Sequence, residues 1–214
     1  MPVVGLTGGI ASGKSTVCGF FKEAGACILD ADQMARQVVM PGEPAWREIV
    51  DLFGRQVLSA DGSLDRTKLG DIVFGDAGRR KALERIIHPR VRQAMDSATA
   101  GVAAARPEAL IIQDVPLLLE TGMHQGLAEI IVVHVPEEVQ IERLVRRDGM
   151  GREQALRRIR AQMPLDQKRS LATILIDNSG SLERTREQVL RIFRCLAGRK
   201  GAESPDADKT PCKI

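Results

Sequence analysis

The sequence predicts an α/β fold in which a parallel sheet carries helices on both faces. Three observations support this class. A glycine-rich loop joins an apolar strand to a helix near the start of the chain, short apolar strands alternate with helices, and two helical segments interrupt the alternation. Alternation is typical of parallel sheets, because each parallel crossover needs a long connection. The 214 residues are enough for one core with small insertions.

The first predicted element is a buried strand over residues 3–6, and a helix follows from Ser15. Between them, Gly8-x-x-x-x-Gly13-Lys14-Ser15 fits the phosphate-binding loop pattern G-x-x-x-x-G-K-[S/T]. Its glycines let backbone N–H groups turn toward an anion, and the helix N-terminus adds positive charge. Lys14 would reach the β- and γ-phosphates of a nucleotide, while the Ser15 hydroxyl would ligate magnesium. A plain glycine-rich turn is the alternative, but it has no use for this lysine and hydroxyl.

The later elements follow from hydrophobic patterning. The helix over 15–24 leads to a strand over 26–29, which ends at Asp30-Ala31-Asp32. The next stretch, 33–106, is mostly helical, with a buried face at Ile49, Val50 and Phe53, a turn at Asp61-Gly62, and a long helix that Pro89 should kink or divide. Further strands are predicted over 109–112, 130–135 and 174–176, with a closing amphipathic helix over 181–196.

These elements divide the chain into a core, two insertions and a tail. The core has three parts, 1–32, 107–137 and 171–198, and a tail over 199–214 is predicted to be disordered. The helical segment 33–106 is too long for a simple crossover, so we interpret it as an insertion that binds an acceptor. The arginine-rich segment 138–170 is interpreted as a lid. A nucleotide core with these two insertions is the layout of a small-molecule kinase.

Charge supports the second insertion as a place that handles a small polyanion. Residues 143–169 hold nine basic and three acidic residues, a net charge of +6, whereas the whole chain carries +3. A solvated helical face is the alternative for such a run, and it stays open at this point.

Composition excludes several classes of partner and site. Aromatic residues make up only 3%, which argues against a surface that stacks nucleic-acid bases. No apolar stretch approaches the ~20 residues of a membrane span, and no basic leader is visible. We therefore expect a cytoplasmic protein with no nucleic-acid or membrane partner. The cysteines form no C-x-x-C pair and are expected to be free thiols: Cys18, Cys27, Cys195 and Cys212.

Two carboxylates are candidates for the chemistry. Asp32 follows the second strand, near where ligands bind in open parallel sheets, and could accept the proton of an attacking hydroxyl. Its alternative role is the N-cap of a helix that starts at Gln33. Asp114 follows the third strand in a weak Walker-B-like pattern and could hold magnesium through water. A GTPase is excluded, because guanine recognition in that family resembles an N-K-x-D motif. Asn178 is the only asparagine of the chain, and it is followed by Ser179 rather than by lysine.

Along nearly its whole length up to Leu196, the chain resembles the dephospho-coenzyme A kinase family. The matching stretches, in order, are Leu6-Thr7-Gly8-Gly9-Ile10, Asp30-Ala31-Asp32 with Ala35-Arg36, Phe53-Gly54, Asp61-Gly62-Ser63-Leu64-Asp65-Arg66, Val73-Phe74, His88-Pro89 with Arg92, Pro116-Leu117-Leu118-Leu119-Glu120, Gln140-Ile141-Glu142-Arg143, Arg146-Arg147-Asp148, Gln162 and Asn178. Each is weak alone, but together and in order they are specific.

The resemblance implies a P-loop NTPase-type fold and transfer of the ATP γ-phosphate to the ribose 3′-hydroxyl of dephospho-coenzyme A. ATP phosphates would be held by Gly8, Ala11, Ser12, Gly13, Lys14, Ser15, Thr16 and Arg147. Mg²⁺ would be held by Ser15 and Asp114. Asp32, Lys14 and Arg143 are the implied catalytic residues, with Asp32 as base and Arg143 as the lid arginine that neutralises the transferring phosphoryl group.

The same resemblance implies that Asp32, Arg66, His88 and Arg92 contact the acceptor. For His88, capping or core hydrogen bonding beside Pro89 is an equal alternative. We expect ATP and dephospho-coenzyme A as small-molecule partners and a monomer or small homo-oligomer. Two rivals stay open: a kinase for another small acceptor, and a nucleotide-driven regulatory or assembly ATPase.

Two positions depart from the family pattern. Ala11 stands where glycine is usual. A positive φ would cost alanine roughly 1 kcal/mol, so we expect an ordinary conformation there. Thr173 stands where an aspartate is usual before the last strand, which puts in doubt a polar role near the adenine.

Overall fold

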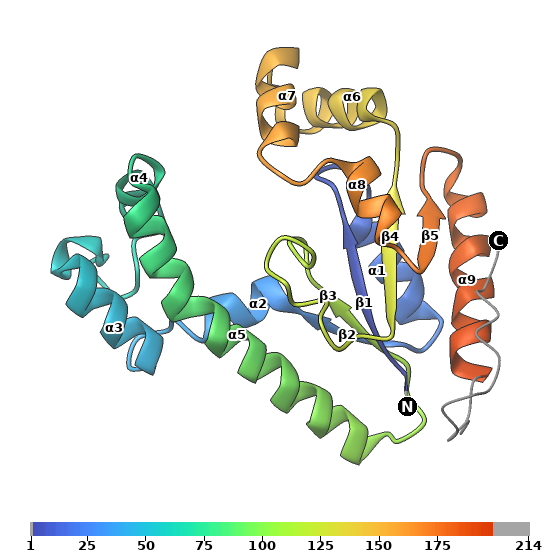
Figure 1. Cartoon of the computed structure of the whole chain (residues 1–214), viewed down its shortest axis with the longest axis horizontal. Helices are drawn as coiled ribbons and strands as arrows, with labels where there is room; N and C mark the ends of the chain where they lie inside the picture. The colour runs from blue at the N-terminus through green and yellow to red at the C-terminus, as the bar shows by residue number, and fades with distance from the viewer. Residues whose placement is uncertain (1, 199–214) are drawn as a thin grey trace. The chain divides into compact units, whose positions relative to one another are not determined.

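The computed structural model of the chain describes residues 2–198. Its elements, coloured along the chain in Figure 1, are β1 Val3–Gly8, α1 Lys14–Glu23, β2 Cys27–Asp30, α2 Ala31–Gln37, α3 Pro44–Phe53, the 3₁₀ turn η1 Arg55–Val57, α4 Arg66–Phe74, α5 Ala77–Ala105, β3 Ile111–Asp114, β4 Glu129–His134, α6 Glu137–Asp148, α7 Arg152–Arg160, α8 Leu165–Ser170, β5 Ile174–Asp177 and α9 Leu182–Gly198.

A five-stranded sheet in the order β2-β3-β1-β4-β5 forms the centre of the core. Strand β1 pairs in parallel with β3 and β4, and β4 pairs in parallel with β5. The carboxyl ends of these strands therefore share one edge of the sheet, where α/β proteins bind ligands. Because Leu6 pairs with both Asp114 and Ile131, the loop after β1 starts between the ends of its two neighbours. The predicted α/β class with a parallel sheet is confirmed.

The two faces of the sheet are covered by different elements. Alternate residues of β1, β4 and β5, such as Leu6 and Val133, are buried with Phe21 of α1 and Ile192 of α9. On the other face, Thr7 contacts the segment after β3 by donating its hydroxyl to Pro116 O at 2.9 Å. The sheet is thus the middle of three layers, and its edge is left open for the phosphate-binding loop.

The strands lie close to their predicted positions, except that β3 begins and ends two residues later than predicted. Strand β3 covers Ile111–Asp114 instead of 109–112, because Ala109 N–H donates to Arg106 O in the turn that follows α5. Asp114 is consequently the last residue of the strand and is 8% exposed.

The described residues divide into two compact units, one formed by 2–29 together with 99–198, the other by Asp30–Ala98. The second unit overlaps the predicted insertion 33–106 and has its own core, to which Ile49 and Phe53 of α3 contribute. Its helix α5 continues through Pro89 as one element, so of the two predicted effects of Pro89 the division of the helix is wrong, and the kink stays a prediction. The Arg90 side chain donates to Ile86 O at 2.7 Å and also pairs with Glu48 of α3, which ties the helices together beside the proline.

The remaining expectations concern the tail, the cysteines, metal sites and membrane-spanning helices. The predicted disordered tail, 199–214, and Cys212 lie outside the described residues. Within them, Cys18, Cys27 and Cys195 form no disulfide, and no cluster of three or more His, Cys, Asp or Glu side chains is placed to hold a metal. No helix in this part of the chain is long and apolar enough to cross a lipid bilayer.

Candidate active site

The loop between β1 and α1 has the backbone shape that the motif predicts. Gly13 has φ 86° and immediately precedes Lys14, the first residue of α1. The first turn of the helix closes with Thr16 N–H and Val17 N–H both donating to Gly13 O, at 3.0 and 3.2 Å. No side chain caps this end, so the N–H groups of Lys14 and Ser15, at the start of the helix, are available to an anion.

Ala11 corrects one expectation. Its φ is 59°, the only positive φ of a residue other than glycine in the described chain. The ordinary conformation that we expected is therefore wrong, and the loop pays roughly 1 kcal/mol to keep a side chain here. Packing compensates, since Ile10 and Ala11 lie against the apolar cluster of α6 and α7 that includes Ile141 and Ile159.

The motif lysine and the β3 carboxylate are in direct contact. Lys14 Nζ donates to Asp114 Oδ1, and their side chains are only 18% and 11% exposed. Parallel pairing of β1 with β3 puts the loop after β1 beside the carboxyl end of β3, so Lys14 at the start of α1 reaches Asp114, the last residue of β3. The predicted phosphate-binding lysine and the predicted magnesium carboxylate thus belong to one cluster.

The hydroxyls of the loop lie in different environments. Ser15 is exposed on the first turn of α1, whereas Thr16 is half-buried. Ser12 is fully buried, and its Oγ has no hydrogen-bond partner among the described residues. A buried hydroxyl without a partner is unusual in a native structure.

The two predicted arginines have different surroundings. Arg143 donates through Nη1 to Ala11 O and Ser12 O, at 3.4 and 3.3 Å, and through Nη2 to Asn178 O at 2.8 Å. Its guanidinium therefore lies against the loop backbone. Arg147 instead forms a bidentate pair with Asp148, in which Nε donates to Oδ1 at 2.6 Å and Nη2 donates to Oδ2 at 3.0 Å. That hydrogen bond raises the pKa of Arg147 and lowers the pKa of Asp148.

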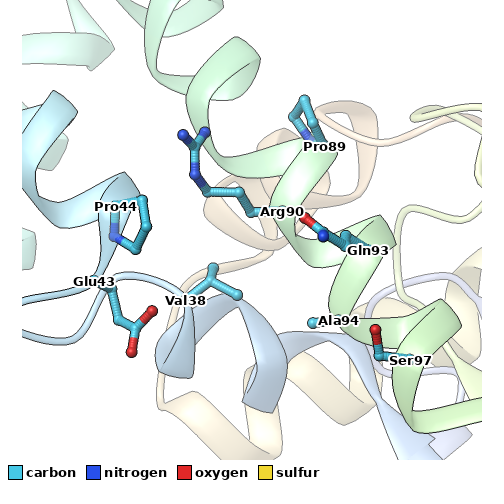
Figure 2. A pocket seen from close by; sticks show the side chains of 8 residues that line it. All are labelled: Val38, Glu43, Pro44, Pro89, Arg90, Gln93, Ala94 and Ser97. Atoms are coloured by element: carbon cyan, nitrogen blue, oxygen red, sulfur yellow. The ribbon is translucent and has the colours of Figure 1, made fainter.

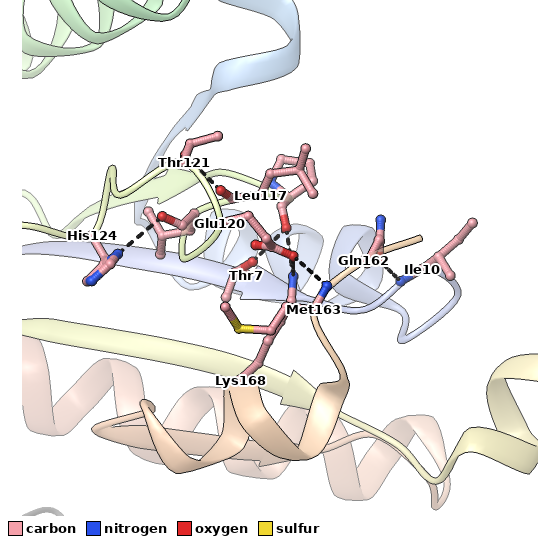
Figure 3. A network of polar contacts seen from close by, with 11 residues as sticks. Thr7, Ile10, Leu117, Glu120, Thr121, His124, Gln162, Met163 and Lys168 are labelled. Carbon is pink, nitrogen blue, oxygen red and sulfur yellow. Dashed lines mark hydrogen bonds and ion pairs between the residues drawn. The ribbon is translucent and has the colours of Figure 1, made fainter. Parts of the chain in front are cut away.

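The arginine-rich segment also contains a lysine, Lys168, that is one of the nine basic residues counted over 143–169 and that the structure places inside. Lys168 is fully buried, donates to Pro116 O at 3.2 Å and pairs with Glu120 at 2.8 Å (Figure 3). Glu120 also accepts Met163 N–H at 3.2 Å. Net charge along the sequence does not distinguish this buried cation from the exposed ones.

The four predicted acceptor contacts all lie in the second unit. Helix α2 begins at Ala31 and not at Gln33, and its N-cap is Asp30, whose carboxylate accepts the N–H groups of Asp32 and Gln33 at 2.8 and 3.1 Å. The capping alternative for Asp32 is therefore wrong, and Asp32 is exposed in the first turn. His88 is exposed in the middle of α5, so it is neither a cap nor a core residue.

Arg66 and Arg92 are exposed as well, on α4 and α5. Arg66 lines a cavity of about 460 Å³ together with Arg36, Ser63 and the apolar residues Val39, Met40, Pro41 and Leu64. A larger cavity of about 600 Å³ lies between the end of α2, the start of α3 and the later turns of α5. It is lined by Val38, Glu43, Pro44, Pro89, Arg90, Gln93, Ala94 and Ser97 (Figure 2).

Thr173 has a structural role that explains its place. Ile130 N–H donates to Thr173 Oγ1 at 2.8 Å, and Thr173 N–H donates to Ile130 O at 3.1 Å. These bonds join the starts of β4 and β5, at the sheet edge opposite the phosphate-binding loop. Thr173 thus has a structural role at this edge, and the doubt about a polar role near the adenine stays a prediction.

Comparison with known proteins agrees with this geometry. The family model described as dephospho-CoA kinase matches residues 2–184. The dephospho-CoA kinase of Carboxydothermus hydrogenoformans is 47% identical over 194 residues, which cover 91% of this chain and 94% of that one. The dephospho-CoA kinase of Anaeromyxobacter dehalogenans is 45% identical over 207 residues, which cover 97% and 98%.

A solved structure gives the same result for the fold. Dephospho-CoA kinase from Campylobacter jejuni superposes with a TM-score of 0.71 at 25% identity, covering 92% of this chain and 98% of that one. The family model and the relatives each extend over most of the chain, and the chain therefore belongs to the dephospho-CoA kinase family.

Proposed function

We propose that the chain transfers the γ-phosphate of ATP to the ribose 3′-hydroxyl of dephospho-coenzyme A, giving coenzyme A and ADP. The observation that carries the proposal is the contact of Lys14 with Asp114 beneath an uncapped helix N-terminus, in a chain of the dephospho-CoA kinase family. A cation, a carboxylate and unpaired N–H groups are the parts that a nucleotide triphosphate needs.

At the nucleotide end, residues 11–16 and Gly8 would surround the phosphates. Lys14 would exchange Asp114 for the β- and γ-phosphates when ATP binds. Arg143, held against the loop carbonyls, would face the charge that develops on the transferring phosphoryl group. Arg147 is the further candidate for the nucleotide phosphates.

The residues present fit magnesium. Asp114 and Ser15 offer hard oxygen donors, and so small a set suits an ion that keeps several waters and binds substrate phosphates. Ser15 would hold the ion directly and Asp114 through water. When bound, magnesium would neutralise charge on the β- and γ-phosphates.

At the acceptor end, we assign the unit Asp30–Ala98 to dephospho-coenzyme A. Its diphosphate bridge is an anion, and the cavity beside Arg36 and Arg66 offers two guanidinium groups with no acidic residue in its lining. His88 and Arg92 are further candidate contacts on α5. The apolar and amide-bearing lining of the larger cavity, with Pro44, Pro89 and Gln93, suits the pantetheine arm.

The proposed step is an in-line displacement. The 3′-oxygen forms a bond to the γ-phosphorus while the bond from that phosphorus to the bridging oxygen of ADP breaks. The hydroxyl proton passes to the Asp32 carboxylate, and ADP leaves with the electron pair. The segment 138–170 would act as a lid that excludes water during transfer, which prevents hydrolysis of ATP.

We further propose a cytoplasmic enzyme that acts as a monomer or small homo-oligomer on these two small molecules. Incubation of the protein with ATP, magnesium and dephospho-coenzyme A, read by mass spectrometry, tests the activity. The expected product is coenzyme A, formed by the parent and not by a Lys14→Met variant. Phosphorylation of a different small acceptor with no change in dephospho-coenzyme A would contradict the proposed substrate.

A further inference from the structure

Ile10, in the phosphate-binding loop, has both its backbone C=O and its backbone N–H hydrogen-bonded to side-chain amides. Gln140 Nε2 donates to Ile10 O at 2.7 Å, and Ile10 N–H donates to Gln162 Oε1 at 2.9 Å. Gln140 lies on α6, one turn before Arg143 and on the same helix face. Gln162 lies between α7 and α8, and Figure 3 shows its amide beside Ile10.

A third amide holds the loop two residues further on. Asn178 Nδ2 donates to Ser12 O at 2.7 Å, and the asparagine is itself fixed because Thr185 donates its hydroxyl to Asn178 Oδ1 at 2.8 Å. Gln140 and Asn178 are 3% and 4% exposed. Burial restricts the orientation of both amides, and the bond from Thr185 fixes that of Asn178, so they can hold the loop in one conformation.

The glycines of the loop make room for these amides. A Cβ on Gly9 would lie 2.5 Å from Gln140 Nε2, and a Cβ on Gly13 would overlap Asn178 Nδ2. At both positions any larger residue would push an amide off the carbonyl that it holds. Glycine is therefore needed here for the approach of the protein's own side chains as well as for the turn.

We propose that Gln140, Gln162 and Asn178, which we call the amide clamp, are positioning residues that aim the loop's N–H groups at the nucleotide phosphates. The proposal rests on the proposed function. In a trans peptide, C=O and N–H point in opposite directions, and the described chain has no cis peptide bond. A donor on Ile10 O therefore turns Ala11 N–H away from Gln140, and a donor on Ser12 O turns Gly13 N–H away from Asn178.

The clamp also decides which N–H groups are available. Ile10 N–H is taken by Gln162, and Ser12 N–H donates to Gly9 O at 3.1 Å, so neither is available to phosphate, whereas Ala11 N–H and Gly13 N–H are turned away from the clamp. Because Gln140 and Gln162 both belong to the segment 138–170, and because Ile10 and Ala11 pack against its apolar cluster, that segment sets the shape of the loop. Displacement of the segment would release both backbone groups of Ile10 together.

A pair of isosteric variants tests the clamp. Gln140→Met removes the donor and keeps the chain length, and Gln113→Met makes the same change at a glutamine that is 6% exposed and donates to Thr99 Oγ1 at 3.1 Å. ATP binding is titrated with magnesium and without acceptor, beside a melting curve for each protein. We expect Gln140→Met to raise the Kd for ATP on the order of tenfold, the effect of one lost buried hydrogen bond. We expect Gln113→Met to lower Tm and leave the Kd near the parent's.

A second pair separates the hydrogen bond from charge and keeps the test valid if Gln140→Met is unstable. Gln140→Glu and Gln162→Glu each add one negative charge beside Ile10. The first places a carboxylate against a carbonyl oxygen, whereas the second keeps an acceptor for Ile10 N–H. A Kd raised several-fold more by Gln140→Glu than by Gln162→Glu supports the clamp. Equal Kd values for this pair, or a parental Kd in Gln140→Met, would overturn it.

The titration also separates this inference from the proposed function. A parent that binds ATP but leaves dephospho-coenzyme A unchanged would remove the proposed acceptor, while the comparison of Kd values would still decide the clamp. A parent that binds no nucleotide would overturn both.

Discussion

Lys14 Nζ donates a hydrogen bond to Asp114 Oδ1, so the cation of the phosphate-binding loop is neutralised by the carboxylate at the end of β3. Both side chains are largely buried, and an unpaired charge in such a place is costly. In the proposed function, the phosphates of ATP would replace Asp114 as the partner of the lysine. Its release would leave the Asp114 carboxylate for magnesium, so one exchange would prepare both halves of the nucleotide site.

This pair predicts separable effects on turnover and stability. Lys14→Met should abolish turnover, because no cation reaches the β- and γ-phosphates. It should also destabilise the protein by about 1–3 kcal/mol, because Asp114 is left buried without its partner. Adding Asp114→Asn should recover most of the stability and none of the turnover. Initial rates and melting curves of the three proteins give the answer, and near-parental turnover in Lys14→Met would remove the loop from the mechanism.

Arg143 is predicted to act mainly in the transfer step. Arg143→Ala should lower kcat by about 10²-fold, the usual effect of removing one donor to developing charge. The Kd for ATP should rise less, through the lost bonds to Ala11 O and Ser12 O. Arg143→Lys keeps the positive charge but loses the planar guanidinium with its paired donors, so it should recover part of kcat. If kcat and ATP affinity fell equally in Arg143→Ala, the arginine would be a binding residue only.

The proposed role of Asp32 as general base can be tested with Asp30, the N-cap of α2, as a control. Asp32→Asn should lower turnover by ~10²-fold or more, because a general base is lost, and should leave Tm nearly unchanged. Asp30→Asn is the matched control, since asparagine still caps α2 and little should change. Steady-state rates for both variants decide the question. Asp32→Asn turnover within a few-fold of the parent's would leave the chemistry to Lys14, magnesium and Arg143.

Sequence patterns predicted what depends on local order. The loop motif, the parallel strands and the position of Lys14 follow from residues that are adjacent in the chain. The contacts of Gln140 and Asn178 with the loop span more than a hundred residues, and no local pattern contains them. The positive φ of Ala11 and the burial of Lys168 were missed for the same reason, because packing from distant helices overrides the local preference of each residue.

The hydrogen bonds of the Asp177 carboxylate should contribute to the loss of stability at low pH. Its carboxylate accepts the hydroxyl and the N–H of Ser179, at 2.6 and 2.9 Å, and these bonds hold the pKa of Asp177 below its ordinary value. The folded state is therefore favoured above the ordinary value, near 4, and this stabilisation is lost as pH falls through the lower folded-state pKa. Asp177→Asn should make the fall of Tm between about pH 5 and 3 shallower. An unchanged slope would show that this turn does not contribute.

The central claim is the destination of the γ-phosphate, and ATP labelled in that group tests it most directly. The protein is incubated with labelled ATP, magnesium and dephospho-coenzyme A, and the position of the label is then determined in every product. The account predicts label in the 3′-phosphate of coenzyme A and unlabelled ADP. Label released as inorganic phosphate, with dephospho-coenzyme A unchanged, would contradict it and identify a nucleotide-driven ATPase instead.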